Sequence, residues 1–185
     1  SLLVRAGHQG TVRFGRFNVD FAVGQFGFGE NSIYPTSFDG PDGCLGLGPA
    51  APVLGSRDRT LQPGDLVFAD VGCGVEGYES DITRTTVFGK PTDKMKSVWG
   101  IVRRAQDAAL AAARPGVPGE EIDAAARNVI AGAGYGPGYK YFTHRLGHGI
   151  GMDGHEWYYL VHGNKRPEAA GNMHSNEPGI YIPGE

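Results

Sequence analysis

The sequence predicts an α+β fold, and three observations support that class. Residues 92–114 and 120–131 have the 3.6-residue apolar periodicity of amphipathic helices. Much of the remaining chain consists of short apolar runs bounded by glycine, proline and aspartate, which is typical of strands joined by turns. Glycine is abundant, with 31 residues where average usage gives about 13. Such an excess suits tight turns and close approaches of one backbone to another.

Length and composition bound the class of protein. The 185 residues show no repeat and no second domain, so residues 1–185 are expected to form one domain. A net charge of −3 gives no electrostatic reason to bind nucleic acid or an anionic membrane surface. There is no signal peptide and no apolar run of about 18 residues, so no membrane segment is expected. The two cysteines, Cys44 and Cys73, fit no disulfide or zinc pattern and predict a cytoplasmic location.

The first third of the chain contains no predicted helix. Residues 1–35 carry short apolar runs such as "FAVGQFGFG" without helical periodicity. Residues 36–58 are dense in glycine, proline and aspartate, which predicts a long surface loop.

Two strand-like segments follow that loop. Residues 66–69 form a short apolar run that predicts a strand, and Asp70 ends it. Residues 77–89 are also strand-like. If "CGVEG" at 73–77 is a hairpin turn, Asp81 lies on the strand next to the one that ends at Asp70.

The two helices have recognisable ends. Thr92 is a plausible N-cap, with Asp93 in the first turn, and a proline and a glycine at 115–116 end the first helix. The glycine-rich "GAGYGPG" at 132–138 ends the second. The predicted inward-facing residues are Val98, Ile101, Val102, Ala105, Ala109 and Ala112 in the first helix, and Ile122, Ala125, Ala126, Val129 and Ile130 in the second.

The stretch "HRLGHGIGMDGHE" at 144–156 places His144, His148 and His155 close together. The i, i+4 spacing of the first two would suit a zinc site on a helix. Four glycines in the same stretch argue against a helix, since each costs about 1 kcal/mol relative to alanine. The His-Glu pair at 155–156 also does not begin an HExxH zinc motif, because position 159, where the second histidine would stand, is tyrosine. Extended or turning chain that directs the histidines into a cleft is therefore expected.

Four residues in apolar, strand-like settings could carry chemistry: Asp70, Asp81, His148 and Glu177. The last of them precedes a Pro-Gly pair and the apolar run "IYI" at 180–182, which predicts another strand. Taken singly, each is better explained as an ordinary turn, cap or surface residue. Taken together, carboxylates gathered without cations would repel and raise each other's pKa. Divalent metal ions remove that repulsion, and an oxygen-rich ligand set favours Mn, Fe, Co or Zn.

Three segments, in this order, resemble one known family: "PGDLVFADVG…GYESDITRT", "HRLGHGIGMDGHE" and "SNEPGIYIPGE". They are similar to the motifs of the pita-bread metallopeptidases, which include Xaa-Pro aminopeptidases, prolidases, methionine aminopeptidases and creatinase. The resemblance covers roughly residues 60–185 and is strongest in the Xaa-Pro peptidase branch. It implies a pita-bread fold, with a curved antiparallel sheet and flanking helices.

The resemblance also implies a pair of divalent metal ions, Mn, Co, Fe or Zn, held by two aspartates, one histidine and two glutamates. Asp70 and Asp81 match the two aspartates, with the expected spacing of eleven residues, and Asp81 would bridge the ions. His148 matches the histidine ligand, and Glu177 matches the first glutamate. The second glutamate would lie beyond Glu185, which itself comes too early in the motif.

The implied chemistry is attack on a peptide carbonyl by a hydroxide that bridges the metal ions. Glu177 would accept the proton of the water. His155, and with it His144, would hydrogen-bond the developing oxyanion. Trp157, Tyr158 and Tyr159 fit either a wall for a proline ring or an ordinary aromatic core.

Two departures from the family pattern stand out. The chain begins after the helices that open the family's domain and stops before the last ligand, so residues 1–185 are expected to be a partial catalytic domain, truncated at both ends. Residues 36–58 also lack the histidine that many relatives carry ahead of the first aspartate.

The sequence therefore favours a metal-dependent Xaa-Pro aminopeptidase or dipeptidase that acts on short proline-containing peptides. The alternatives are a non-catalytic pita-bread module that binds peptide or protein, and a metal-free creatinase-like C–N hydrolase. Retention of Asp70, Asp81, His148 and Glu177 argues against both alternatives. Many members of the family pair as homodimers, so the resemblance also implies a homodimer.

Overall fold

The computed structural model describes residues 9–14, 17–26, 63–64 and 66–182, and within the strands at 9–26 and 67–75 it describes the backbone only. The predicted loop at 36–58 and Glu185 lie outside the described residues. The chain divides into two compact units, Ser1–Pro91 with Ile182–Glu185, and Thr92–Tyr181. Assignment of residues 1–185 to a single catalytic domain stays a prediction.

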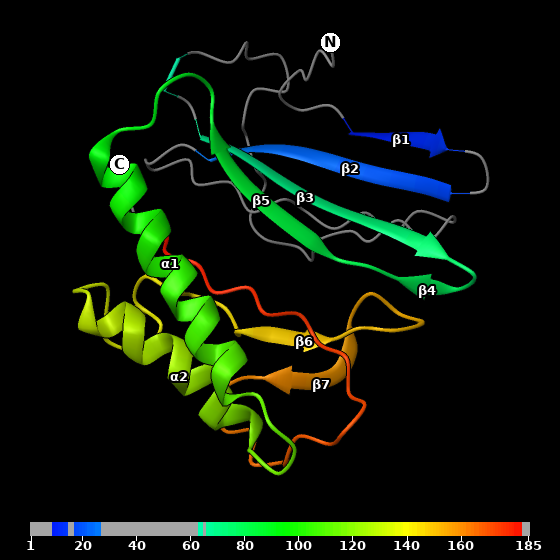
Figure 1. Cartoon of the computed structure of the whole chain (residues 1–185), viewed down its shortest axis with the longest axis vertical. Helices are drawn as coiled ribbons and strands as arrows, with labels where there is room; N and C mark the ends of the chain where they lie inside the picture. Colours follow the sequence, from blue (N-terminus) through cyan, green and yellow to red (C-terminus); the bar gives the residue numbers. More distant parts are fainter. Residues whose placement is uncertain (1–8, 15–16, 27–62, 65, 183–185) are drawn as a thin grey trace. The chain divides into compact units, whose positions relative to one another are not determined.

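The first unit contains an antiparallel sheet (Figure 1). Strand β3 pairs with β2 along one edge and with β4 and β5 in succession along the other, while β1 extends the sheet beyond β2. The strands of this sheet are β1 (Gln9–Phe14), β2 (Phe17–Phe26), β3 (Leu66–Val75), β4 (Tyr78–Glu79) and β5 (Ile82–Val87).

A two-residue turn joins β3 to β4. Glu76 and Gly77, its central residues, have φ angles of 54° and 82°, as a type I′ hairpin turn requires. A hairpin turn is thus present within 73–77, but it is shorter than the five residues considered, because residues 73–75 belong to β3, which is longer than the strand predicted at 66–69. The register of β3 with β4 continues unchanged into β5, so Ser80 and Asp81 lie in a short gap between two pieces of one edge.

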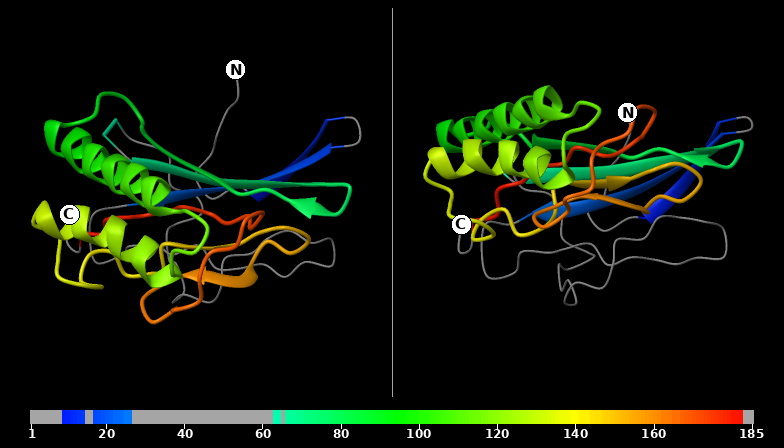
Figure 2. Two further views of the ribbon diagram at one scale, coloured as in Figure 1. Left: turned by 60° about the horizontal axis from the view of Figure 1, so that its bottom comes forward. Right: turned by 90° about the horizontal axis from the view of Figure 1, so that it is seen from below.

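The second unit contains both predicted helices, α1 (Asp93–Ala112) and α2 (Gly119–Gly132), which lie side by side (Figure 2). Thr92 caps α1 as expected, because its Oγ1 accepts a hydrogen bond from the backbone N–H of Met95 at 3.2 Å. Neither described helix is both long enough and apolar enough to cross a membrane. Buried residues of the predicted stripes are Val98, Ile101, Ala105 and Ala109 in α1, and Ile122, Ala126 and Ile130 in α2.

Two short strands, β6 (Gly147–Gly149) and β7 (Glu156–Leu160), form an antiparallel pair, and β7 packs against α2. The aromatic run before residue 160 divides between core and surface, since Tyr158 is buried whereas Trp157 is 61% exposed. The core of this unit consists of Ile101, Ala105, Ala109, Ile122, Ala126, Ile130, Phe142, Leu146, Tyr158 and Leu160.

The apolar run "IYI" at 180–182, interpreted from sequence as a strand, is not a strand in the described part of the chain. Tyr181 donates one backbone hydrogen bond to the carbonyl of Tyr141 at 2.8 Å. Pro178, just before the run, has no backbone N–H to extend the pairing. That part of the sequence prediction is wrong.

Helix α2 ends in a Schellman motif. The N–H of Gly134 bonds to the carbonyl of Ala131 at 3.0 Å, and the N–H of Tyr135 bonds to that of Ile130 at 3.1 Å. Gly134 has a φ of +91°, whereas Gly132 does not adopt a positive φ. A methyl group would meet no atom within 4 Å at either position, so only backbone conformation separates them.

The same substitution should therefore have opposite effects at these two glycines. Gly134→Ala forces a side chain into the left-handed region and should lower the free energy of unfolding by about 1 kcal/mol. Gly132→Ala should raise it by about 0.5 kcal/mol, because alanine restricts the unfolded chain. Urea unfolding followed by tryptophan fluorescence measures both. Equal effects of the two substitutions would contradict this account of the helix end.

Candidate metal centre

Strand β6 makes backbone hydrogen bonds along both of its edges. On one edge it pairs with β7, where His148 stands opposite Tyr159. On the other edge the N–H of Ser175 bonds to the carbonyl of His148 at 2.8 Å. Two residues later the N–H of Glu177 bonds to the carbonyl of Leu146 at 2.9 Å. Residues 175–177, in the C-terminal segment coloured red in Figure 1, therefore run along β6.

A glycine permits that close approach. A Cβ atom at Gly147 would overlap the backbone carbonyl oxygen of Ser175 and crowd its carbonyl carbon at 2.8 Å. Backbone atoms cannot move aside as the end of a flexible side chain can, so only glycine fits at this position. The glycine-rich histidine stretch thus forms strand and turn, as the sequence predicts.

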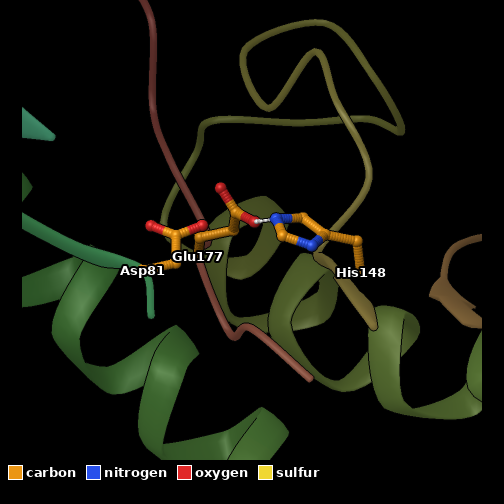
Figure 3. A group of neighbouring side chains, drawn as sticks. All are labelled: Asp81, His148 and Glu177. Carbon is orange, nitrogen blue, oxygen red and sulfur yellow. Dashed lines mark ion pairs between the residues drawn. The ribbon is translucent and has the colours of Figure 1, made fainter. Parts of the chain in front are cut away.

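The pairing along β6 brings His148 and Glu177 together. The Nε2 atom of His148 lies 3.1 Å from Oε1 of Glu177 (Figure 3). The imidazole is 3% exposed, whereas Glu177 is half-buried. The other ring nitrogen, Nδ1, lies 2.9 Å from the carbonyl oxygen of Gly149. Because a carbonyl only accepts, this bond assigns a proton to Nδ1 and leaves Nε2 as the ring nitrogen that faces the carboxylate.

Ser175 holds both of these groups. Its hydroxyl donates to Oε1 of Glu177 at 2.6 Å and accepts from the backbone N–H of His148 at 3.0 Å. Ser175 is not among the residues predicted from the sequence. Its position two residues before Glu177 in extended chain was a usable signal, since residues at i and i+2 share a face.

His155 stands against the ring of His148, with ring centroids 3.9 Å apart and planes inclined by 44°. Its side chain is exposed. The neighbouring Glu156 shapes the turn before β7, because its Oε1 accepts from the backbone N–H of Met152 at 2.9 Å.

His144 lies in a hydrogen-bonded position of its own. Its Nδ1 lies 2.8 Å from the carbonyl of Arg145, and its Nε2 lies 2.7 Å from the hydroxyl of Tyr181. Burial is the main cause that lowers the pKa of His144, and the charges of Arg127 and Arg145 lower it further. The bond to the carbonyl of Arg145 and the charge of Glu177 oppose that shift. At neutral pH the ring is therefore neutral, with Nδ1–H as donor and Nε2 as acceptor from Tyr181.

The two predicted aspartates belong to the first unit. Asp81 is half-buried in the gap between β4 and β5 and is the third residue labelled in Figure 3. Asp70 lies within β3, where the register pairs it with Thr83, and its side chain lies outside the description. Asp70 and the position that faces Asp81 in the continued register, Gly72, are two residues apart on β3 and therefore share a face of the sheet.

The chemistry of the donor set in the second unit fits a divalent metal ion. A metal-binding histidine usually donates the N–H of its other ring nitrogen to a backbone carbonyl or carboxylate, as Nδ1 of His148 does to Gly149. The carboxylate beside it supplies an oxygen, and a mixed nitrogen and oxygen set suits Mn, Fe, Co or Zn.

Gly147→Ala should separate residues 175–177 from β6. We expect faster amide hydrogen exchange at Ser175 and Glu177, because their N–H groups bond to His148 of β6 and to Leu146 just before it. The overlap should also lower the free energy of unfolding by about 1–3 kcal/mol. Gly100→Ala, in α1, is the matched control, since the nearest atom to its Cβ is the end of the Arg104 side chain at 3.7 Å. Exchange rates in Gly147→Ala equal to those of the control would refute the role given to this glycine.

The chain is similar in sequence or structure to three known proteins. An Xaa-Pro dipeptidase from Lactobacillus delbrueckii subsp. lactis is 46% identical over 155 residues, which is 84% of this chain and 41% of that protein. The structure of a prolidase from Pyrococcus furiosus matches 68% of this chain and 36% of its own, with a TM-score of 0.65 and 43% identity. That of dipeptidase PepE from Mycobacterium ulcerans matches 78% of this chain and 36% of its own, with a TM-score of 0.66 and 46% identity.

These likenesses confirm the predicted α+β pita-bread fold class. The chain spans about two fifths of the length of the Lactobacillus relative. A family model described as Metallopeptidase family M24 matches residues 20–185. The match begins well before the first of the three motifs that carry the resemblance. Such a family implies a divalent metal ion. The chain belongs to metallopeptidase family M24.

Proposed function

We propose that this chain is the metal-binding part of an enzyme that hydrolyses the peptide bond next to proline in short peptides. The observation that carries the proposal is the buried His148 imidazole, whose Nε2 atom lies 3.1 Å from a carboxylate oxygen of Glu177. Family membership and the Xaa-Pro dipeptidases among its relatives support the choice of reaction and substrate. An Xaa-Pro dipeptidase is the first candidate, and an Xaa-Pro aminopeptidase is the second.

Four residues are the proposed metal ligands: Asp70, Asp81, His148 and Glu177. Asp81, His148 and Glu177 each offer one ligand atom suited to a divalent ion. Asp70 joins them because the register gives it the same face of the β3–β5 hairpin as Asp81. We assign them to a pair of ions, with manganese first and Co, Fe or Zn as alternatives.

The bound ions would polarise the scissile carbonyl and lower the pKa of bound water toward neutrality. Glu177 is the proposed proton acceptor, with Ser175 orienting its carboxylate through the 2.6 Å hydrogen bond. His155, exposed beside His148, is the proposed hydrogen-bond donor to the carbonyl oxygen as charge develops on it. His144 is the second proposed contact to substrate. Its neutral ring has no spare N–H in the present arrangement, so this contact requires one of its two hydrogen bonds to exchange.

The wider setting follows the same proposal. Residues 1–185 are assigned to one catalytic domain of the pita-bread type. A homodimer and a cytoplasmic location are proposed with it, the latter because Cys44 and Cys73 show no disulfide pattern.

The direct test is elemental analysis after manganese loading and extensive dialysis, together with release of proline from Leu-Pro. We expect about two ions per chain, as in two-metal hydrolases, and cleavage of Leu-Pro with no cleavage of Leu-Ala. His148→Ala and Asp81→Ala should each lose metal and activity.

His162→Ala is the matched control, because His162 is an exposed histidine in the turn after β7. It should keep metal and activity. Wild-type metal retention in His148→Ala would refute the ligand assignment. A chain that binds Leu-Pro but retains no metal would support the non-catalytic binding module instead.

A further inference from the structure

Helix α2 carries an ion pair that is almost completely buried. Nε of Arg127 lies 2.7 Å from Oδ2 of Asp123, and the two side chains are 11% and 1% exposed. The residues are one helical turn apart, where side chains on one face meet. Sequence periodicity assigned neither of them to the interior.

Three further hydrogen bonds of Arg127 go to backbone carbonyls of the segment that leads into β6. Nη2 donates to the carbonyl of His144 at 2.6 Å, and Nη1 donates to that of Phe142 at 2.8 Å. A longer bond of 3.3 Å reaches the carbonyl of Gly138. The guanidinium also lies over the ring of Tyr139 at 3.8 Å, so its plane is fixed from one side as well.

Asp123 binds the same segment through its second oxygen. Oδ1 accepts from the backbone N–H of Leu146 at 3.2 Å. The carbonyl of Leu146 in turn accepts from the N–H of Glu177. Leu146 therefore connects Asp123 to the segment that carries Glu177. Leu146 also lies two positions before His148.

A buried ion pair is weak evidence for stability on its own, because apolar residues of similar volume can stabilise a protein equally well. The backbone groups that the pair binds are more informative about its role. Arg127 and Asp123 together fix the backbone at His144 and at Leu146, on either side of Arg145. No apolar pair could hold those two peptide groups.

We propose that Asp123 and Arg127 are positioning residues of the metal centre. They fix the backbone of residues 144–146 and thereby set the separation of His148 from Glu177 and the orientation of His144. This inference rests on the proposed function, because it takes His148 and Glu177 to be metal ligands.

The test uses the full 185-residue chain and measures cobalt(II) affinity and the visible absorption spectrum of bound cobalt, which reports ligand geometry. Arg127→Lys keeps the charge beside Asp123 but loses the planar fork that reaches the carbonyls. Asp123→Asn keeps the volume and removes the charge. The matched controls are Arg104→Lys and Asp107→Asn, which make the same changes at exposed positions of α1.

Arg127→Lys and Asp123→Asn should each bind cobalt at least about tenfold more weakly than wild type and show an altered spectrum, because loss of the groups that orient metal ligands commonly lowers metal affinity by that much. Both controls should match wild type. Wild-type affinity and spectrum in folded Arg127→Lys, with only a lower melting temperature, would overturn the inference and leave the pair a structural role. Since removal of one partner of a buried pair can unfold a protein, Arg127→Lys decides the matter if Asp123→Asn does not fold.

Failure of the proposed function has a different signature. If the wild-type chain binds no cobalt, the metal centre is wrong, and amide exchange at Glu177 then decides the positioning role. Exchange at least about tenfold faster in Arg127→Lys than in Arg104→Lys supports that role, because the bond to Leu146 opens more often. Equal exchange rates overturn it.

Discussion

The backbone of β6 hydrogen-bonds along both edges, and the position of the reactive side chains in the second unit depends on that constraint. β7 occupies one edge, and residues 175–177 occupy the other. Glycine at position 147 makes the second pairing sterically accessible, since any Cβ would overlap the carbonyl of Ser175. Glycine in a strand loses conformational entropy and packing surface on folding. That cost is offset by the backbone hydrogen bonds that place His148 beside Glu177.

Electrostatics explains why the pairing of His148 with Glu177 suits the binding of a cation. A buried imidazole nitrogen that faces a carboxylate at 3.1 Å is a costly arrangement unless a proton or a cation lies between them. The hydrogen bond from Nδ1 to Gly149 fixes which nitrogen faces the carboxylate, and Ser175 fixes the carboxylate. Both features are typical of ligands oriented for a metal ion. The ion pair on α2 binds the backbone just before β6, through the carbonyl of His144 and the N–H of Leu146.

Local sequence patterns predicted much of the fold. They did not predict the contacts between residues that lie far apart in the sequence. Both helices, the cap at Thr92 and the hairpin turn follow from patterns within one or two turns of chain. The interior position of Asp123 does not, because its partner atoms include the N–H of Leu146, far along the sequence. Ser175 and Tyr181 matter for the same reason, through contacts with residues more than twenty positions away. The candidate ligands came instead from the spacing of three short motifs, which carry information that periodicity lacks.

His148 and Glu177 are proposed to bind the same metal ion. Anomalous diffraction at the zinc absorption edge, from zinc-loaded crystals of the chain, locates that ion. We expect an anomalous peak about 2.1 Å from His148 Nε2 and from a carboxylate oxygen of Glu177, the usual lengths of such bonds. A peak elsewhere, with Nε2 still next to the Glu177 carboxylate, would contradict this assignment.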